Sequence, residues 1–275
     1  MSRPVKSALR VLDVLKLFAD SKRALTQSEI YLRLGIPQSS ANFLLRTMIE
    51  AGYITYYRET RVYFPTPEVL HLGKWLEGFG YDFLFGESVI ADLMAELGER
   101  TDETVSITSQ NDIFVHFHRI NPRNRPPELD FAQGLVVPLT YSSYGQMLLS
   151  RQPDRQIDRV CRLIRAREED PARRFDIDTM VARIRALRAR EFAYSLNPML
   201  PSAGSVATIL PITIAGRDVA IGVGGPAARI EQRLDEIVDL MRISVTNHTS
   251  RLITVFGNSH LAPGDDEEMA TRARE

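Results

Sequence analysis

The chain of 275 residues is 44% hydrophobic and 25% charged, which is enough length and apolar content for two folded domains. It has no run of about 18 apolar residues and no apolar signal segment, so we expect neither a membrane-spanning helix nor a signal peptide. The only cysteine, Cys161, leaves no partner for an intrachain disulfide or a cysteine-based metal site. We therefore expect a reduced cytoplasmic protein without a metal or cofactor.

The net charge of −1 hides an uneven distribution. Residues 1–65 carry ten basic and five acidic side chains, and the rest of the chain carries 24 basic and 30 acidic ones. A basic N-terminal region on an acidic body is typical of a protein that meets nucleic-acid phosphates at one end. Small domains also acquire such charges by chance, so the pattern alone leaves both interpretations open.

Apolar residues at helical spacing predict a first helix over residues 5–19. Its expected buried stripe is Val5, Leu9, Leu12, Leu15 and Leu17/Phe18. A second helix is predicted after Thr26, because Thr26 and Glu29 have the spacing of a capping box. Gly35 is the expected C-cap of that helix.

A third helix is predicted to begin at Pro37, where a first turn tolerates a missing N–H, and to stop at Gly52. Its expected buried residues are Ala41, Leu44, Leu45, Met48 and Ile49. The period then changes from about 3.6 to 2, and the runs "YITYYR" and "RVYFP" predict a hairpin with a turn at Glu59-Thr60. Three helices followed by a hairpin indicate a winged helix-turn-helix.

After Pro65 and Pro67, which mark a domain boundary, the pattern is that of a mixed α/β body. We expect a linker helix, a break near 78–86 and a helix to about Arg100. We then expect strands over 103–110 and 112–120 with a turn at Asn111-Asp112, a loop at 121–127, a strand ending at Thr140, and a helix over 143–150. The remaining expected elements are helices near 153–168 and 177–190, strands over 205–214 and 217–225 with a turn at Ala215-Gly216, and a helix over 229–257.

The order and spacing of several motifs resemble those of the IclR-type bacterial transcriptional regulators, from about Lys6 to Phe256. The N-terminal motifs are "SALRVLDVLKLF", "LTQSEIYLRLGIPQSSANFLL" and Leu45, Met48, Gly52 and Tyr53. The C-terminal motifs are Gly134-x-x-x-Pro138-Leu139, "SSYGQ", "GSVATILPI" and "AIGVGGP".

The resemblance implies an α+β protein with a winged helix-turn-helix domain over 1–66, a linker helix over 67–85 and a GAF-like effector-binding domain over 86–258. The polar residues 259–275 are expected to be a disordered tail. The resemblance also implies double-stranded operator DNA, a small-molecule effector and a homodimer or dimer of dimers as partners. Apolar faces on the first helix and on residues 68–77 are the expected dimer contacts.

Four positions depart from the family pattern. Phe43 stands where the recognition helix usually has an arginine, Gln146 replaces a lysine, and Thr140 replaces a histidine. The glutamate expected before the last strand pair is missing, and Asn197 lies near its place. These differences leave the operator sequence and the ligand open.

The side of the third helix that faces away from its apolar stripe carries side chains suited to DNA. Amides can bind adenine edges, Arg46 can bind guanine, and an exposed Phe43 can contact a thymine methyl. Serines at the helix N-terminus suit phosphate, and cations can come from the N-terminal arm and the wing. The predicted DNA contacts are Thr26, Gln27, Gln38, Ser39, Ser40, Asn42, Phe43, Arg46, Arg58 and Arg61. The alternative is an amphipathic helix whose Phe43 merely covers a neighbour.

The resemblance implies a ligand pocket between the "SSYG" segment, the loop before the last strand pair, and those strands. Family members that bind small polar acids often have cysteine and serines where this chain has Ala207, Gly222 and Gly224, so we expect a bulkier, less polar effector such as an aromatic acid, stacked on Tyr144. The predicted ligand contacts are Phe117, Leu135, Thr140, Ser142, Ser143, Tyr144, Gly145, Asn197, Ala207, Gly222 and Gly224. The alternative is that glycine serves close packing and that Phe117 or Tyr144 fills the pocket.

An enzyme is the main competing class of function. The segments "SAGS" and "IGVGGP" lack the spacing of a nucleophile elbow or a phosphate loop. His116 and His118 share a strand face without a cysteine or acidic pattern, so we expect an exposed face rather than a zinc site. We therefore expect no catalysis, but a regulator whose effector shifts domain pose or oligomer and hence operator affinity. A sensor or partner-binding protein without specific DNA reading is the other alternative.

Overall fold

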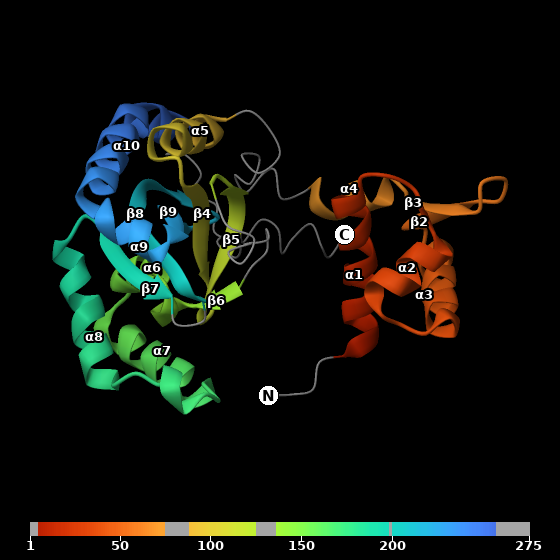
Figure 1. The fold of residues 1–275 in the computed structure, drawn as a ribbon, viewed down its shortest axis with the longest axis horizontal. Coiled ribbons are helices and arrows are strands. Elements are labelled where there is room, and N and C mark those ends of the chain that lie inside the picture. The colour runs from red at the N-terminus through yellow and green to blue at the C-terminus, as the bar shows by residue number, and fades with distance from the viewer. Residues whose placement is uncertain (1–4, 75–87, 125–135, 198–199, 257–275) are drawn as a thin grey trace, which may run out of the picture. The chain divides into compact units, whose positions relative to one another are not determined.

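The computed structural model describes residues 5–74, 88–124, 136–197 and 200–256 (Figure 1). The chain divides into two compact units, residues 1–77 and 78–275. Each unit has its own apolar core. The expected α+β fold with an N-terminal helix-turn-helix is confirmed.

The N-terminal unit packs three helices against a small antiparallel sheet. Its elements are α1 (Lys6–Ser21), β1 (Leu25–Thr26), α2 (Gln27–Leu34), α3 (Gln38–Glu50), β2 (Ile54–Tyr57), β3 (Val62–Pro65) and α4 (Glu68–Lys74). The sheet order is β1-β3-β2. The strand β1 has only two residues, too few to show an alternating pattern in the sequence, and was not expected.

The local signals around α2 are confirmed. The Thr26 side chain accepts from the Glu29 backbone N–H, and the Glu29 carboxylate accepts from the Thr26 N–H at 2.8 Å, which completes the capping box. Gly35 ends the helix in the left-handed conformation at φ +61°. Pro37 is the N-cap of α3 and lies one residue before the first helical turn.

The predicted buried stripe of α1 is largely wrong. Val14 and Phe18 are buried, whereas Val5, Leu9 and Leu12 are exposed. The helix is apolar on two nearly opposite sides, and only the side that includes Phe18 meets α2 and α3. In α3 the stripe is mostly as expected, except that Ile49 is exposed.

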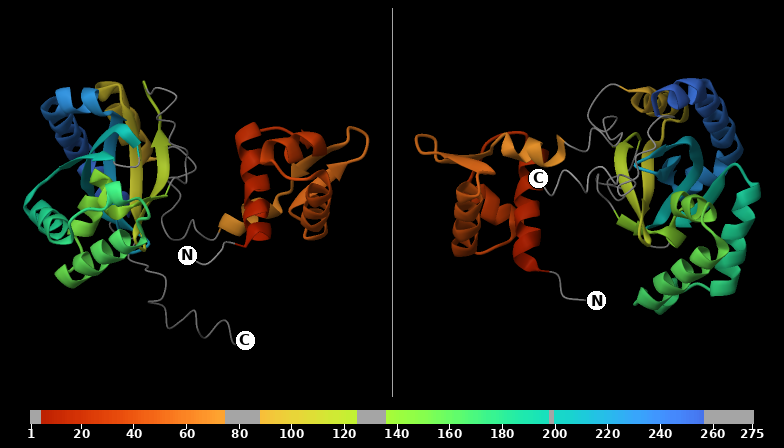
Figure 2. Two further views of the ribbon diagram at one scale, coloured as in Figure 1. Left: turned by 60° about the horizontal axis from the view of Figure 1, so that its bottom comes forward. Right: turned by 180° about the vertical axis from the view of Figure 1, so that it is seen from behind.

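The C-terminal unit is a six-stranded antiparallel sheet with helices on both faces (Figures 1 and 2). The strands, in spatial order, are β6 (Val136–Pro138), β5 (Phe114–Asn121), β4 (Thr104–Asn111), β9 (Arg217–Pro226), β8 (Leu200–Ile214) and β7 (Ala193–Asn197). One face carries α5 (Val89–Thr101), α9 (Ala227–Gln232) and α10 (Leu234–Phe256), and the other carries α6 (Ser143–Ser150), α7 (Asp154–Arg167) and α8 (Ile177–Ala186).

Two predicted boundaries in this unit need correction, and one strand was missed. The strand expected to end at Thr140 stops at Pro138, and Leu139–Tyr141 form a 3-10 turn. The single helix expected over 229–257 is two helices broken at Arg233, whose guanidinium donates to the Thr101 carbonyl. The edge strand β7 was not expected. The hairpin turns at Asp112 and Ala215-Gly216 are confirmed, and both have left-handed backbone.

A buried carboxylate ties β4 to α9. Glu103 is fully buried, and its Oε2 accepts from Arg229 Nη2 at 2.7 Å while Oε1 accepts from Arg229 Nε. Arg233 lies farther away, with 3.8 Å between Nη1 and Oε1. A Cβ at Gly225 would lie 2.2 Å from Glu103 Oε2, so a glycine is required beside this carboxylate. Arg229 also donates to the Asn124 carbonyl at 2.7 Å.

We expect Arg229→Ala to lower the free energy of unfolding of the C-terminal unit by about 3–5 kcal/mol, because it leaves a buried carboxylate without its bidentate partner. Urea unfolding of the full chain followed by circular dichroism measures this. Arg251→Ala is the matched control. Its guanidinium pairs with Asp92 at 2.9 Å but is exposed, so a loss below about 1 kcal/mol is expected. Equal losses in the two variants would contradict the assigned role of Glu103.

The histidine pair on β5 is not the exposed face that was expected. The His116 and His118 rings lie 4.7 Å apart between centroids, and both residues are half-buried. His118 Nε2 lies 2.7 Å from Ser109 Oγ on β4. Burial, and next the nearby His116 and Arg217, lower the pKa of His118 to about 4.

The His118 pKa predicts a pH dependence of stability. A proton binds more tightly to the unfolded chain, where the pKa is near the ordinary 6.5, than to the folded one. The contribution of His118 should therefore be complete above pH 6.5 and decline as the pH falls towards 4. We expect His118→Gln to flatten the loss of unfolding free energy between these pH values. If the variant and wild type lose stability in parallel, His118 is not responsible.

Candidate functional site

The outer face of α3 is open. Ala41, Leu45 and Met48 bury the inner side of the helix, and the opposite side carries Phe43 with 73% of its surface exposed. The other exposed side chains on that side are Gln38, Ser39, Asn42 and Arg46, while Ser40 is half-buried. Phe43 therefore does not cover a neighbour in the described structure, and its ring is available to a partner.

The charge of Arg46 is locally balanced. Its Nε donates to Glu50 Oε1 at 2.8 Å one turn along the helix, and both side chains are more than half exposed. Such a pair contributes only about 0.3–0.5 kcal/mol. Exchanging it for a nucleic-acid contact therefore costs little.

The remaining predicted DNA contacts lie at the start of α2 and in the hairpin. The Thr26 hydroxyl is engaged in the helix cap, and Gln27 is half-buried. The neighbouring Glu29 has its pKa lowered to about 2, mainly by the hydrogen bond from Arg23 and then by those from Thr26. Arg58 and Arg61 are exposed in the turn between β2 and β3, and Arg61 has φ +56°.

The second candidate site lies between α6 and the sheet. Directly paired residues of neighbouring strands point to one face, so the register defines two rows beneath α6. The outer row is Ser195, Ser205, Gly224 and Thr104, and the inner row is Ala193, Ala207, Gly222 and Ser106. The outer row is rich in hydroxyl groups, whereas the inner row is mostly small and apolar.

Tyr144 of α6 fills the space above the inner row. A Cβ at Gly222 would lie only 2.5 Å from Tyr144 Cε1, and the Tyr144 and Phe117 rings meet edge to face at 5.3 Å. Ser106 lines the same cavity as the Tyr144 side chain. Burial raises the pKa of this phenol far above its ordinary value, and the Ser106 hydroxyl acts in the opposite direction. The structure thus favours the close-packing interpretation of Gly222 over the expectation of an open volume.

A small cavity of about 30 Å³ remains beside the Tyr144 hydroxyl. Its lining residues are Thr104, Ser106, Phe117, Ser142, Tyr144, Ala203, Gly204, Ser205 and Gly224. A cavity of this size holds a water molecule rather than an organic ligand. A larger ligand therefore requires a side chain or α6 to move.

Hydroxyl groups gather at the N-terminus of α6, next to this cavity. Ser142 caps the helix by accepting from the Gly145 N–H at 3.2 Å, and Ser143 Oγ donates to Ser205 Oγ at 2.8 Å. Ser195, next to Ser205 in the outer row, is 96% buried, yet its hydroxyl has no hydrogen bond to any described residue. Unpaired donors and the positive end of a helix together suit an anionic oxygen.

The structure brings some predicted ligand contacts together and leaves others apart. Phe117, Ser142, Tyr144 and Gly224 line the cavity, and Ser143, Ala207 and Gly222 pack beside it. Gly145 is required for packing, because a Cβ there would lie 2.2 Å from the Leu139 carbonyl oxygen. Thr140 is buried and does not line the cavity. Leu135 and the side chain of Asn197 lie outside the described residues.

Four hydroxyl-bearing residues of this site were not predicted. They are Thr104, Ser106, Ser195 and Ser205. Thr104 and Ser106 occupy alternate positions of β4, and Ser195 on β7 pairs directly with Ser205 on β8. The alternation of small polar residues in "TVSIT" is the signal in the sequence that points to a shared face.

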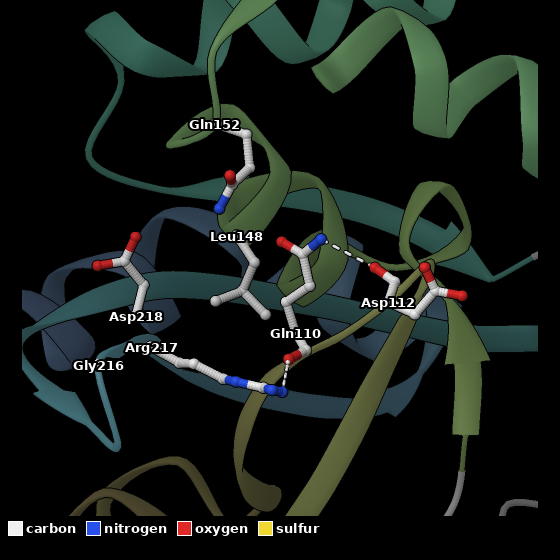
Figure 3. A pocket seen from close by; sticks show the side chains of 7 residues that line it. All are labelled: Gln110, Asp112, Leu148, Gln152, Gly216, Arg217 and Asp218. Carbon is white, nitrogen blue, oxygen red and sulfur yellow. Dashed lines mark hydrogen bonds between the residues drawn. The ribbon is translucent and has the colours of Figure 1, made fainter. Parts of the chain in front are cut away.

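A larger cavity of about 290 Å³ lies at the other end of the sheet, near the β4–β5 and β8–β9 turns (Figure 3). Several of its polar groups bind one another, whereas Gln110 Oε1 is buried there without a hydrogen bond to any described residue. Arg217 Nη1 donates to the Gln110 carbonyl at 3.0 Å, and Gln110 Nε2 donates to the Asp112 carbonyl at 2.9 Å. The smaller cavity is the better candidate, because a buried hydroxyl without a partner and a helix N-terminus converge beside it.

Among the described residues, no group of three or more His, Cys, Asp or Glu side chains is placed to hold a metal ion. None of the described helices is both long and apolar enough to span a bilayer.

Comparisons with known proteins agree with this architecture. The sequence model of the IclR helix-turn-helix domain matches residues 7–57. The effector domain of an IclR-type regulator from Acinetobacter sp. ADP1 is 31% identical, with a TM-score of 0.55, and the match covers 58% of this chain and 93% of that one. No match to a curated protein was found.

Two full-length structures share the fold at lower identity. IclR from Thermotoga maritima has 15% identity and a TM-score of 0.64, and the match covers 90% of this chain and 99% of that one. An IclR homologue from Microbacterium hydrocarbonoxydans, solved in complex with 4-hydroxybenzoate, has 17% identity, the same TM-score and the same coverage. With the helix-turn-helix match and the 31% identity across the effector domain, this chain belongs to the IclR family of transcriptional regulators.

Proposed function

We propose that this regulator reads operator DNA with the exposed face of α3 and that an aromatic carboxylic acid bound between α6 and the sheet controls its affinity. The observation that carries the first part is the outward face of α3, where amide groups, an arginine and a bare phenyl ring stand on a helix held rigidly by its buried side. A helix of this size fits the major groove, where such side chains distinguish bases.

The sources of affinity and of specificity are separate in this proposal. Hydrogen bonds from Gln38 and Asn42 and the apolar contact of Phe43 read base edges. Arg58 and Arg61 in the hairpin supply phosphate contacts, which position the protein and make binding depend on salt. The basic balance of residues 1–65 supports this division.

We expect Phe43→Ala and Asn42→Ala each to weaken binding to the operator about tenfold to a hundredfold, because each loses a base contact that contributes about 1–3 kcal/mol. Fluorescence anisotropy on DNA from upstream of the gene, against scrambled DNA and across a salt series, measures this. Binding to scrambled DNA should change little.

Leu32→Ala is the matched control for these variants. Leu32 is an apolar side chain of α2 that is 69% exposed and lies outside the predicted DNA contacts. If Leu32→Ala weakens operator binding as much as Phe43→Ala, or if the wild type does not prefer the upstream fragment at any salt concentration, α3 does not read DNA as proposed.

The chemistry around α6 supports an acidic effector. The helix N-terminus with Ser142, Ser143 and Ser205, and the unpaired hydroxyl of Ser195, provide donors for a carboxylate. The inner row of Ala193, Ala207 and Gly222 offers small apolar side chains to a ring. The Microbacterium homologue is solved with 4-hydroxybenzoate, a ligand with both features.

Ligand binding acts on operator affinity through a difference between two conformations. Thr104, at the edge of the cavity, is hydrogen-bonded through its hydroxyl to the Arg123 backbone, and the preceding Glu103 holds α9. Movement at the cavity is therefore mechanically connected to the helices on the opposite face of the sheet.

We also propose a homodimer that uses the second apolar side of α1. Val5, Leu9 and Leu12 are 68%, 46% and 54% exposed on one side of the helix, and Leu70 of α4 is 74% exposed. Grouped apolar side chains on a surface favour protein contacts. A twofold dimer presents two reading helices to a palindromic operator.

We expect the double substitution Leu9→Lys and Leu12→Lys to convert the dimer to monomers at micromolar concentration, because each introduces a charge into the apolar contact. Sedimentation velocity measures the change, and Leu32→Lys, which introduces the same charge at an exposed apolar side chain of α2, should leave the oligomer unchanged. A double variant that sediments as the wild type places the dimer contact elsewhere.

A further inference from the structure

The Tyr144 ring lies above Gly222, a position on this sheet face from which no side chain projects. Gly222 lacks a Cβ, and its flanking inner-row neighbours, Ala207 and Ser106, have small side chains. A Cβ at Gly222 would lie 2.5 Å from Cε1 and 2.8 Å from Cζ of the ring, so the hydroxyl-bearing end of the ring lies directly on the strand. The space above Gly222, which we call the slot, holds an aromatic ring.

The slot lies next to the small cavity beside the outer-row hydroxyl groups, which we call the hydroxyl chamber. The Tyr144 ring separates the two spaces. The Tyr144 hydroxyl lies 3.8 Å from the Cβ position of Gly224, in the outer row, and it borders the residual cavity of about 30 Å³. A ligand that places a carboxylate in the chamber must extend its apolar part towards the inner row. That volume is already taken by the tyrosine ring.

We propose that Tyr144 is an internal plug, and that an aromatic acid binds by displacing the Tyr144 ring and laying its own ring on Gly222. This inference rests on the proposed effector site and assigns Tyr144 the opposite role to a stacking partner. The slot accepts a planar ring, because Gly222 closes it below and Phe117 borders it at the edge. A saturated ring of the same size is too thick for it.

The plug has a thermodynamic consequence for affinity. If only the small fraction of molecules with Tyr144 displaced can bind ligand, the apparent Kd equals the intrinsic Kd divided by that fraction. The burial of the ring and its close packing on Gly222 and Phe117 keep the fraction low. Removing the ring should therefore tighten ligand binding, whereas removing a stacking partner would weaken it.

The test is calorimetric titration of the full-length protein, without DNA, with benzoate and 4-hydroxybenzoate. We expect Tyr144→Ala to bind both acids about tenfold or more tightly than the wild type, since a competent fraction below about 10% is being raised to near unity. Tyr144→Phe keeps the ring but removes its hydroxyl from the cavity, so a smaller gain is expected. This second variant decides the question if the alanine variant does not fold.

Two controls locate the binding site. Cyclohexanecarboxylate carries the same charge on a non-planar ring, and it should bind at least tenfold more weakly than benzoate to Tyr144→Ala. Adding Ala207→Val to Tyr144→Ala should abolish the gain, because the larger side chain occupies the slot beside Gly222. Circular dichroism melting of each variant confirms that it is folded.

The outcomes separate the two proposals. Weaker binding of benzoate to both Tyr144 variants would overturn the plug and restore the stacking role. Equal binding of benzoate and cyclohexanecarboxylate would overturn the planar slot. If no folded variant binds any of these acids, both the aromatic effector class and the displacement of Tyr144 are wrong. The proposal that α3 reads operator DNA is tested separately by the anisotropy measurements on the α3 variants.

Discussion

The contact between α6 and the sheet is the constraint on which the C-terminal unit depends. The helix approaches so closely because Gly222 lacks the atom that would hold it away, and Gly145 lets the same helix pack on the 3-10 turn Leu139–Tyr141. A Cβ at Gly222 would collide with the Tyr144 ring and with the Val206 carbonyl oxygen, both at 2.5 Å, and a Cβ at Gly145 would collide with the backbone of Leu139. Interiors are packed like crystals, so such contacts leave no room for gradual adjustment. Movement of Tyr144 must therefore be a discrete change of position.

The opposite face of the same strands is fixed in a different way. Successive residues of a strand point to opposite faces, so Thr104 borders the cavity while Glu103 points to the helices α9 and α10. Gly224 and Gly225 repeat this arrangement on β9, with one glycine under the cavity and the other against the Glu103 carboxylate. The candidate ligand site and the buried ion pair thus lie on opposite faces of the same two strands. A change in strand position at the cavity alters the geometry of the ion pair as well.

Local signals in the sequence predicted the elements well, because they need no distant partner. Thr26, Glu29 and Gly35 fixed both ends of α2. The buried side of α1 was predicted wrongly because the helix has two apolar sides and only tertiary packing selects one. The hydroxyl rows were missed because the register that aligns Ser195, Ser205 and Thr104 arises from strands far apart in the chain. The two interpretations of Gly222 differ only in the separation of helix and sheet, which no sequence pattern records.

The helix α3, which we propose reads DNA, is nearly uncharged because affinity and specificity come from different elements in that proposal. Arg46 and Glu50 are the only charged residues of α3, and they pair with each other, so the helix has no net charge to bring it to DNA. In the proposed complex the hairpin arginines supply attraction over a Debye length, about 8 Å at physiological salt, and the helix acts only on contact. Base contacts through amides and a phenyl ring are short-ranged and insensitive to salt. Salt should therefore change how tightly the protein binds DNA in general much more than how well it distinguishes one operator from another.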